Sequence, residues 1–157
     1  MKRILFILIT MLAASCATTK AVKESKGLIK GTWVLNNINY SESGIYKVNL
    51  LNDVSADCFT GSTWVFVPNN NTGTYSINGS GCNTGTRYFI FTIVDASAGT
   101  SGNQAFILKP TDAKHKSETN QGFRMQLVQL TATSMQIQQS VTVDGKPFTI
   151  TMNFTKQ

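Results

Sequence analysis

Few side chains of this 157-residue chain could carry out a reaction. His115 is the only histidine, and it stands between Lys114 and Lys116 in a polar stretch with no cysteine beside it. This excludes a metal site built on two histidines and a catalytic arrangement that needs a second one. Most carboxylates fall in expected turns, so no pair of acids is visible for acid–base work. These carboxylates are Asp53, Asp57, Asp95, Asp112, Glu118 and Asp144. The sequence predicts a protein that is not an enzyme and needs neither a metal nor another cofactor.

The three cysteines are the remaining reactive groups, and the first follows a leader sequence. Lys2 and Arg3 precede an apolar run over 4–12, and small residues follow, which is typical of a secretory signal peptide. The apolar run is shorter than the roughly 20 residues that a membrane-spanning helix needs. Residues 1–15 are therefore predicted to be removed.

The stretch "FILITMLAASC" resembles the lipobox of bacterial lipoproteins, although Ala13 stands where that family prefers leucine. The resemblance implies that Cys16 receives lipid, becomes the new N-terminus, and anchors the protein to a membrane of the bacterial cell envelope. We expect the outer membrane, and we expect residues 16–28 to form a flexible polar tether. The alternative is an ordinary secreted protein, cut near Ala14, in which Cys16 is an exposed unpaired thiol.

The charge of the chain gives no support for nucleic-acid binding. The formal net charge is +6, and removal of Lys2 and Arg3 leaves +4. Lys20, Lys23 and Lys26 belong to the expected tether, where basic residues are weakly favoured beside anionic lipid. The remaining cations are scattered among carboxylates, and no basic stripe of the kind that binds nucleic acid is seen.

From residue 29 onward the sequence alternates apolar and polar residues in short segments, which is typical of β-strands. The clearest pair is joined by Asp144-Gly145, a strong signal for a two-residue hairpin turn. The only helix candidate follows the first strand, where Ile45, Val48, Leu51 and Val54 approximate a helical stripe. The eight expected strands are 31–40, 62–68, 73–78, 86–95, 103–109, 121–131, 134–143 and 146–155.

Cys58 and Cys82 remain once Cys16 is assigned to lipid. They lie almost symmetrically about the turn at 69–71, so a hairpin there brings them nearly opposite each other. In an oxidising compartment this favours a disulfide over two free thiols.

The segment "GLIKGTWVL", with Gly31 and Trp33 ahead of eight antiparallel strands, resembles the lipocalin family. Residues 58–82 are similar, more specifically, to the lipocalin-like domains of bacterial lipoproteins. The resemblance implies an all-β, eight-stranded antiparallel up-and-down barrel over 29–157, with one short helix between strands 1 and 2. It also implies that Trp33 packs across the closed end of the barrel beneath a basic residue, for which Lys146 and Lys156 are available.

The function that we expect is binding or carriage of a small apolar ligand by a monomer in the cell envelope. The candidate cavity residues are Phe91, Phe106, Met135, Ile150 and Met152. Phe and Met fill cores as readily as they line pockets, so a filled barrel that binds an envelope protein is the alternative. An isomerase-like lipocalin enzyme is disfavoured because acid, base and nucleophilic groups are sparse.

Overall fold

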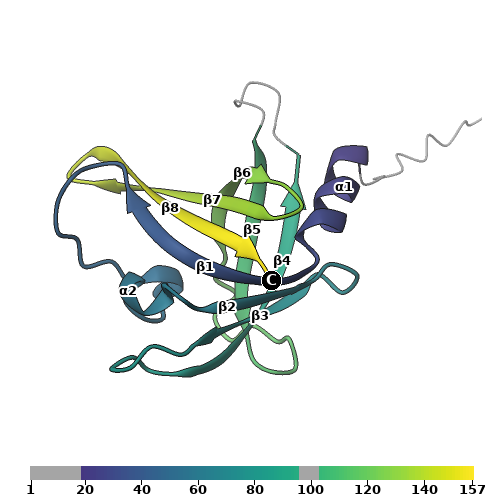
Figure 1. Ribbon diagram of the computed structural model, residues 1–157, viewed down its shortest axis with the longest axis horizontal. Coiled ribbons are helices and arrows are strands. Elements are labelled where there is room, and N and C mark those ends of the chain that lie inside the picture. The colour runs from purple at the N-terminus through teal and green to yellow at the C-terminus, as the bar shows by residue number, and fades with distance from the viewer. Residues whose placement is uncertain (1–18, 96–102) are drawn as a thin grey trace, which may run out of the picture.

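The computed structural model describes residues 19–95 and 103–157 as a single β-barrel with two helices and a 3₁₀ turn (Figure 1). The expected signal peptide and Cys16 lie outside the described residues. The helical elements are α1 Lys20–Ile29, the 3₁₀ turn η1 Leu50–Asn52 and α2 Ala56–Phe59. The strands are β1 Gly31–Tyr40, β2 Thr63–Val67, β3 Thr72–Ile77, β4 Gly85–Val94, β5 Gln104–Thr111, β6 Phe123–Leu130, β7 Ser134–Val143 and β8 Lys146–Lys156.

The eight strands form a closed barrel in sequence order, and every neighbouring pair is antiparallel. Pairing of β1 with β8 closes it, with Trp33 opposite Lys156 and Tyr40 opposite Ile150. The predicted up-and-down barrel is therefore confirmed, and each strand begins and ends within two residues of its predicted bounds. Closure leaves no edge strand unpaired.

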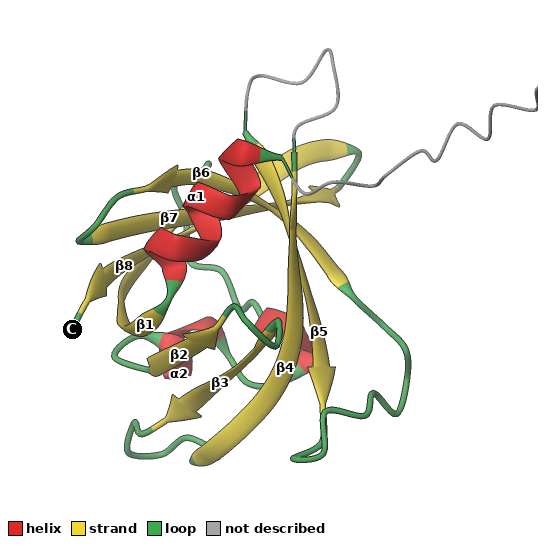
Figure 2. Cartoon of the chain, turned by 90° about the vertical axis from the view of Figure 1, so that its right-hand side faces the viewer, coloured by secondary structure: helices red, strands yellow, loops and turns green. Residues whose placement is uncertain are grey.

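The barrel has two different ends. At one end, α1 lies beside β4 and β6 and leads directly into β1 (Figure 2). We call this the closed end. At the other end lie the last residues of β1, the segment that contains η1 and α2, and the β7–β8 turn (Figure 1). We call this the mouth.

The helix α1 is a correction to the sequence prediction, which expected a flexible tether through residue 28. Thr19 caps the helix by accepting a hydrogen bond from the Val22 backbone N–H at 3.3 Å. Val22 and Ile29 are seven residues apart on one helix face, and both are buried against the barrel. Ser25 donates to Gln104 on β5, so packing onto the barrel stabilises a helix whose own sequence is mostly polar.

The helix expected along Ile45–Val54 is also corrected. Ile45 is fully exposed, so the apolar stripe does not pack as one face. Leu51 and Asn52 have φ angles of 53° and 54°, in the left-handed region, which ends the 3₁₀ turn after a few residues. The one short helix between β1 and β2 is α2, farther along the chain.

Substitution by alanine should have opposite effects at two glycines of the barrel and its helix. Gly27 lies inside α1, and a Cβ there would meet no atom within 4 Å. Gly27→Ala should therefore raise the free energy of unfolding by about 0.5–1 kcal/mol. At Gly73 on β3 a Cβ would lie 2.3 Å from Phe89 Cζ and 2.6 Å from the Val65 carbonyl oxygen. Gly73→Ala should lower the same quantity by about 1–3 kcal/mol. Urea unfolding of both variants checks this, and changes of the same sign would contradict it.

Candidate functional site

The closed end is sealed around Trp33, which is fully buried. Its indole N–H donates to the Ile29 carbonyl oxygen at 2.7 Å, at the end of α1. Lys156 Nζ lies 5.1 Å from the centre of the Trp33 ring and donates to the Leu28 carbonyl oxygen at 2.8 Å. Of the two lysines available from the sequence, Lys156 covers the tryptophan, because Lys146 lies at the β7–β8 turn.

The barrel interior beside β2–β5 is filled by aromatic rings. Phe91 stacks on Phe106 with ring centres 5.6 Å apart, and Phe66 meets them edge-on at 5.5 and 6.1 Å. Trp64 stacks on Tyr75 at 4.8 Å, nearer the mouth. All five side chains are at most 2% exposed. No room for a ligand is left between these rings.

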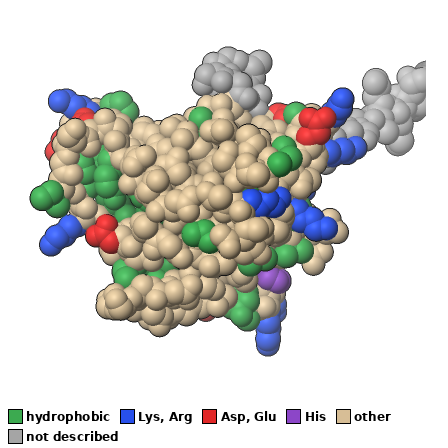
Figure 3. Space-filling view, viewed as in Figure 1, with side chains coloured by type: hydrophobic (Ala, Val, Ile, Leu, Met, Phe, Trp, Pro, Cys, Tyr) green, Lys and Arg blue, Asp and Glu red, His purple; other side chains and the backbone are tan. Residues whose placement is uncertain are grey.

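An apolar groove opens at the mouth instead, on the side of β6–β8. Its volume is about 390 Å³. Figure 3 shows hydrophobic atoms gathered in a hollow at the end of the molecule where Figure 1 places the β7–β8 turn. We call it the mouth groove, and it is lined by Tyr46, Lys47, Val48, Asn49, Leu51, Asn52, Phe123, Gln139, Val141, Val143, Phe148 and Ile150.

Of the five residues predicted to line a cavity, Ile150 lies in the mouth groove. Phe91 and Phe106 belong to the aromatic filling, and Met135 and Met152 are buried in the same core cluster. The groove therefore lies at the rim of the barrel, and Ile150 is the member of the predicted set that lines it. Its walls include Tyr46, Val48 and Leu51 from the connection after β1, which has no regular alternation that could have indicated them.

Aromatic side chains stabilise one wall of the groove. Phe148 on β8 lies 4.7 Å from Tyr46 and 5.5 Å from Tyr40, measured between ring centres. Tyr40 and Tyr46 meet edge-on at 5.3 Å. This cluster holds the otherwise irregular segment after β1 against the barrel.

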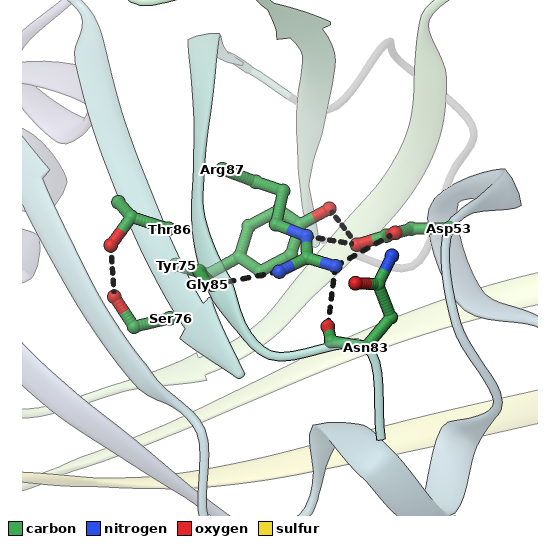
Figure 4. A network of polar contacts seen from close by, with 7 residues as sticks. All are labelled: Asp53, Tyr75, Ser76, Asn83, Gly85, Thr86 and Arg87. Carbon is green, nitrogen blue, oxygen red and sulfur yellow. Dashed lines mark hydrogen bonds and ion pairs between the residues drawn. The ribbon is translucent and has the colours of Figure 1, made fainter. Parts of the chain in front are cut away.

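The segment 50–59, which we call the mouth segment, is fastened to β3 and β4 in two ways. Cys58 and Cys82 form the predicted disulfide, which links α2 to the β3–β4 connection. Arg87 Nε lies 2.9 Å from Asp53 Oδ2, and the same oxygen accepts a hydrogen bond from the Tyr75 hydroxyl at 3.0 Å (Figure 4). Arg87 also donates to the carbonyl oxygens of Gly85 and Asn83.

The Tyr75 hydroxyl keeps its proton at neutral pH. Burial, and then the neighbouring Asp53 carboxylate, raise the pKa of Tyr75 well above its ordinary value of about 10. Tyr75 therefore remains a hydrogen-bond donor to Asp53. The ion pair joins residues 34 apart in sequence, and no local pattern predicts it.

Among residues 19–95 and 103–157, no three His, Cys, Asp or Glu side chains gather closely enough to hold a metal ion. Within the same ranges, none of the helices has both the length and the apolar character to cross a membrane.

Comparisons with known proteins add little to this picture. No protein-family model matches the sequence, and no curated protein does. Among solved structures, a lipocalin-like protein from Bacteroides uniformis ATCC 8492 is similar, with a TM-score of 0.47 and 11% sequence identity. The similarity covers 82% of this chain and 98% of that one. At this level it carries no argument about function. The expected type of barrel is confirmed by the number, order and direction of its own strands.

Proposed function

We propose that this protein binds a small apolar ligand in the mouth groove while it is anchored by lipid on Cys16 to the bacterial cell envelope. The observation that carries the binding proposal is a hollow of about 390 Å³ whose walls include Val48, Leu51 and Phe148. Apolar walls with a few polar groups are typical of small-molecule sites.

The chemistry of the rim narrows the class of ligand. The polar side chains that line the groove are Lys47, Asn49, Asn52 and Gln139, and no carboxylate is among the lining residues. A ligand with an apolar body and a neutral or anionic polar end would match this arrangement. Selectivity should be loose, because few polar partners are available to reject related molecules.

A second candidate function has its own observation. The interior beside β2–β5 is filled, while Ile45 is fully exposed and Val143 is 46% exposed at the mouth. Exposed apolar side chains around a hollow can also receive a protein partner. In that case the barrel would act as a rigid support that presents its mouth to another envelope protein.

Adjacent residues on β7 provide a matched test of ligand binding. Val141 lines the groove, whereas Thr142 is exposed and belongs to the opposite face of the strand. Val141→Trp should abolish saturable uptake of an environment-sensitive fluorescent fatty acid, because the indole fills the hollow, and Thr142→Trp should leave uptake unchanged. Circular dichroism confirms that both variants are folded.

The two functions give different results in that titration. If the folded wild-type protein takes up no apolar probe, the binding proposal is wrong and the interaction module is favoured. Ile150 is a more deeply buried wall residue of the groove. Ile150→Trp should also abolish uptake of the probe, as Val141→Trp does.

The proposed lipid anchor on Cys16 is tested by a separate experiment. Cys16→Ala should abolish incorporation of a radiolabelled fatty acid during growth and should leave a precursor or a soluble form. The measurement is autoradiography of the immunoprecipitated protein, with Cys58→Ala as a control that should still be labelled. A wild-type protein without label would show that Cys16 is not lipidated.

A further inference from the structure

The helix α1 and the mouth groove lie at opposite ends of the molecule (Figure 1). β1 begins at Gly31, directly after α1, and ends at Tyr40 beside the groove. Ten strand residues at about 3.3 Å each separate the two sites by roughly 30 Å. A surface that contacts α1 would therefore leave the groove open on the far side.

Charge is unevenly divided between the two ends. Lys20, Lys23 and Lys30 are exposed on or directly after α1, and Figure 3 shows Lys and Arg atoms on that side of the molecule. Lys26 and Lys156 lie nearby but are engaged by Asn71 and by the Leu28 carbonyl oxygen. Around them, the described side chains that oppose this charge are Glu24 and Asp95.

The mouth end is closer to neutral, with seven cations (Lys47, Arg87, Lys109, Lys114, Lys116, Arg124 and Lys146) against six carboxylates. Its cations, such as Lys47 and Arg87, are interspersed with the other carboxylates of the described chain. These are Glu42, Asp53, Asp57, Asp112, Glu118 and Asp144. An anionic surface would therefore be attracted to the closed end more than to the mouth.

The exposed lysines lie on α1 and directly after it. Lys20 and Lys23 are three residues apart on one face of the helix, and Lys30 follows its last residue, Ile29. Glu24 lies 3.8 Å from Lys20, but both side chains are more than half exposed, so the pair is weak. The opposite helix face, with Val22 and Ile29, is buried against the barrel.

The position of Cys16 in the sequence fixes how far α1 could lie from a lipid anchor. Three residues separate Cys16 from Lys20, the first residue of the helix. Even a fully extended chain spans at most about 3.5 Å per residue, so the helix begins within about 14 Å of the lipidated residue. The Debye length is about 8 Å at physiological salt, so the helix begins within about two Debye lengths of the lipidated residue.

We propose that Lys20, Lys23 and Lys30 form a docking surface for the anionic lipid bilayer that holds the anchor. The closed end then faces the membrane, and the mouth groove faces away from it. The orientation rests on the lipid anchor of the proposed function, whereas the lipid affinity of the lysine face does not. Each lysine near an anionic bilayer should contribute about a five-fold change in partitioning.

The first experiment tests the lysine face without the anchor. The mature chain 16–157 with Cys16→Ala is mixed with sedimentable vesicles of 30% phosphatidylglycerol in phosphatidylcholine at low salt. Changing Lys20, Lys23 and Lys30 together to Gln should lower the partition coefficient by up to about 100-fold. The charge-matched control changes Lys114, Lys116 and Lys146 to Gln at the mouth end and should have little effect. Equal losses in the two triple variants, or no loss in either, would overturn the docking surface.

The second experiment tests orientation in the lipidated protein. With Cys16 lipidated and Cys58 paired with Cys82, a cysteine introduced at Gly27 or Thr142 is the only free thiol for a fluorescent donor. In vesicles that contain a headgroup-linked acceptor, energy transfer should be higher from Gly27→Cys than from Thr142→Cys, and the α1 triple variant should reduce the difference. Equal transfer in the unaltered background would overturn the orientation. Absence of fatty-acid label at Cys16, by contrast, would overturn the anchor and leave the vesicle result standing.

Discussion

Replacing Phe106 with alanine should lower the free energy of unfolding by about 3–5 kcal/mol, the range for truncating a fully buried phenylalanine. Phe106 is 0% exposed and is packed between Phe91 and Phe66. Both neighbours sit on strands of a closed sheet, so they cannot move far to fill the space that the ring leaves. The loss should therefore include a large contribution from the new cavity. Urea or thermal unfolding measures it directly.

Val94→Ala provides the control for this measurement. Val94 lies on the neighbouring strand β4, but its side chain is 41% exposed at the closed end. Its truncation should change the free energy of unfolding by no more than about 0.5 kcal/mol. A loss below about 1 kcal/mol for Phe106→Ala would contradict the close packing of these rings and would favour a ligand cavity between them.

The strands could be predicted because apolar and polar residues alternate along a strand that is buried on one face. Phe148, Ile150, Met152 and Phe154 alternate with polar residues, and all four are buried. The β7–β8 turn was predictable because Asp-Gly tolerates left-handed backbone, and the φ angles of Asp144 and Gly145 are 50° and 76°. These signals act between near neighbours, so an isolated sequence retains them.

The helix α1 could not be predicted in this way. Its few apolar residues lie among lysines. The side chains that stabilise the helix belong to residues far along the chain. Ser25 donates to Gln104, and Lys26 donates to Asn71. Such contacts exist only after the barrel has closed, so composition alone indicated a polar tether.

The sequence alone cannot decide which inward-facing residues line a groove and which fill the core. The alternation of apolar and polar residues identifies the side chains that point into the barrel. It does not show whether rings from other strands already fill the space there. Phe91 and Phe106 fill that space for each other, whereas Ile150 lies close enough to the mouth to remain a wall. The opposite wall comes from Tyr46 and Leu51, whose segment is held by long-range contacts.

Removing the disulfide should have the second large effect. Changing Cys58 and Cys82 together to Ser should lower the free energy of unfolding by about 3 kcal/mol, because the bond closes a loop with a sequence separation of 24. The Asp53–Arg87 pair would still hold the mouth segment, but both side chains are about one-fifth exposed, so this pair alone should contribute roughly 1 kcal/mol. Urea unfolding of the oxidised wild type and the double variant gives the difference.

The same double variant also tests whether the disulfide acts on the groove. The bond fastens α2, which begins four residues after Asn52, and both Leu51 and Asn52 line the groove. Without the bond the mouth segment should open more often, and uptake of the fluorescent fatty acid should weaken even at temperatures where the barrel remains folded.

A second variant separates an effect on the groove from a loss of stability alone. Gly61 follows α2 in the sequence and is not among the groove-lining residues. Its φ is 81° and its Cβ position is open, so Gly61→Ala strains the backbone there without filling the groove. It should lower stability and leave uptake by the folded protein unchanged. If the double variant behaves like Gly61→Ala, the disulfide stabilises the barrel without shaping the mouth.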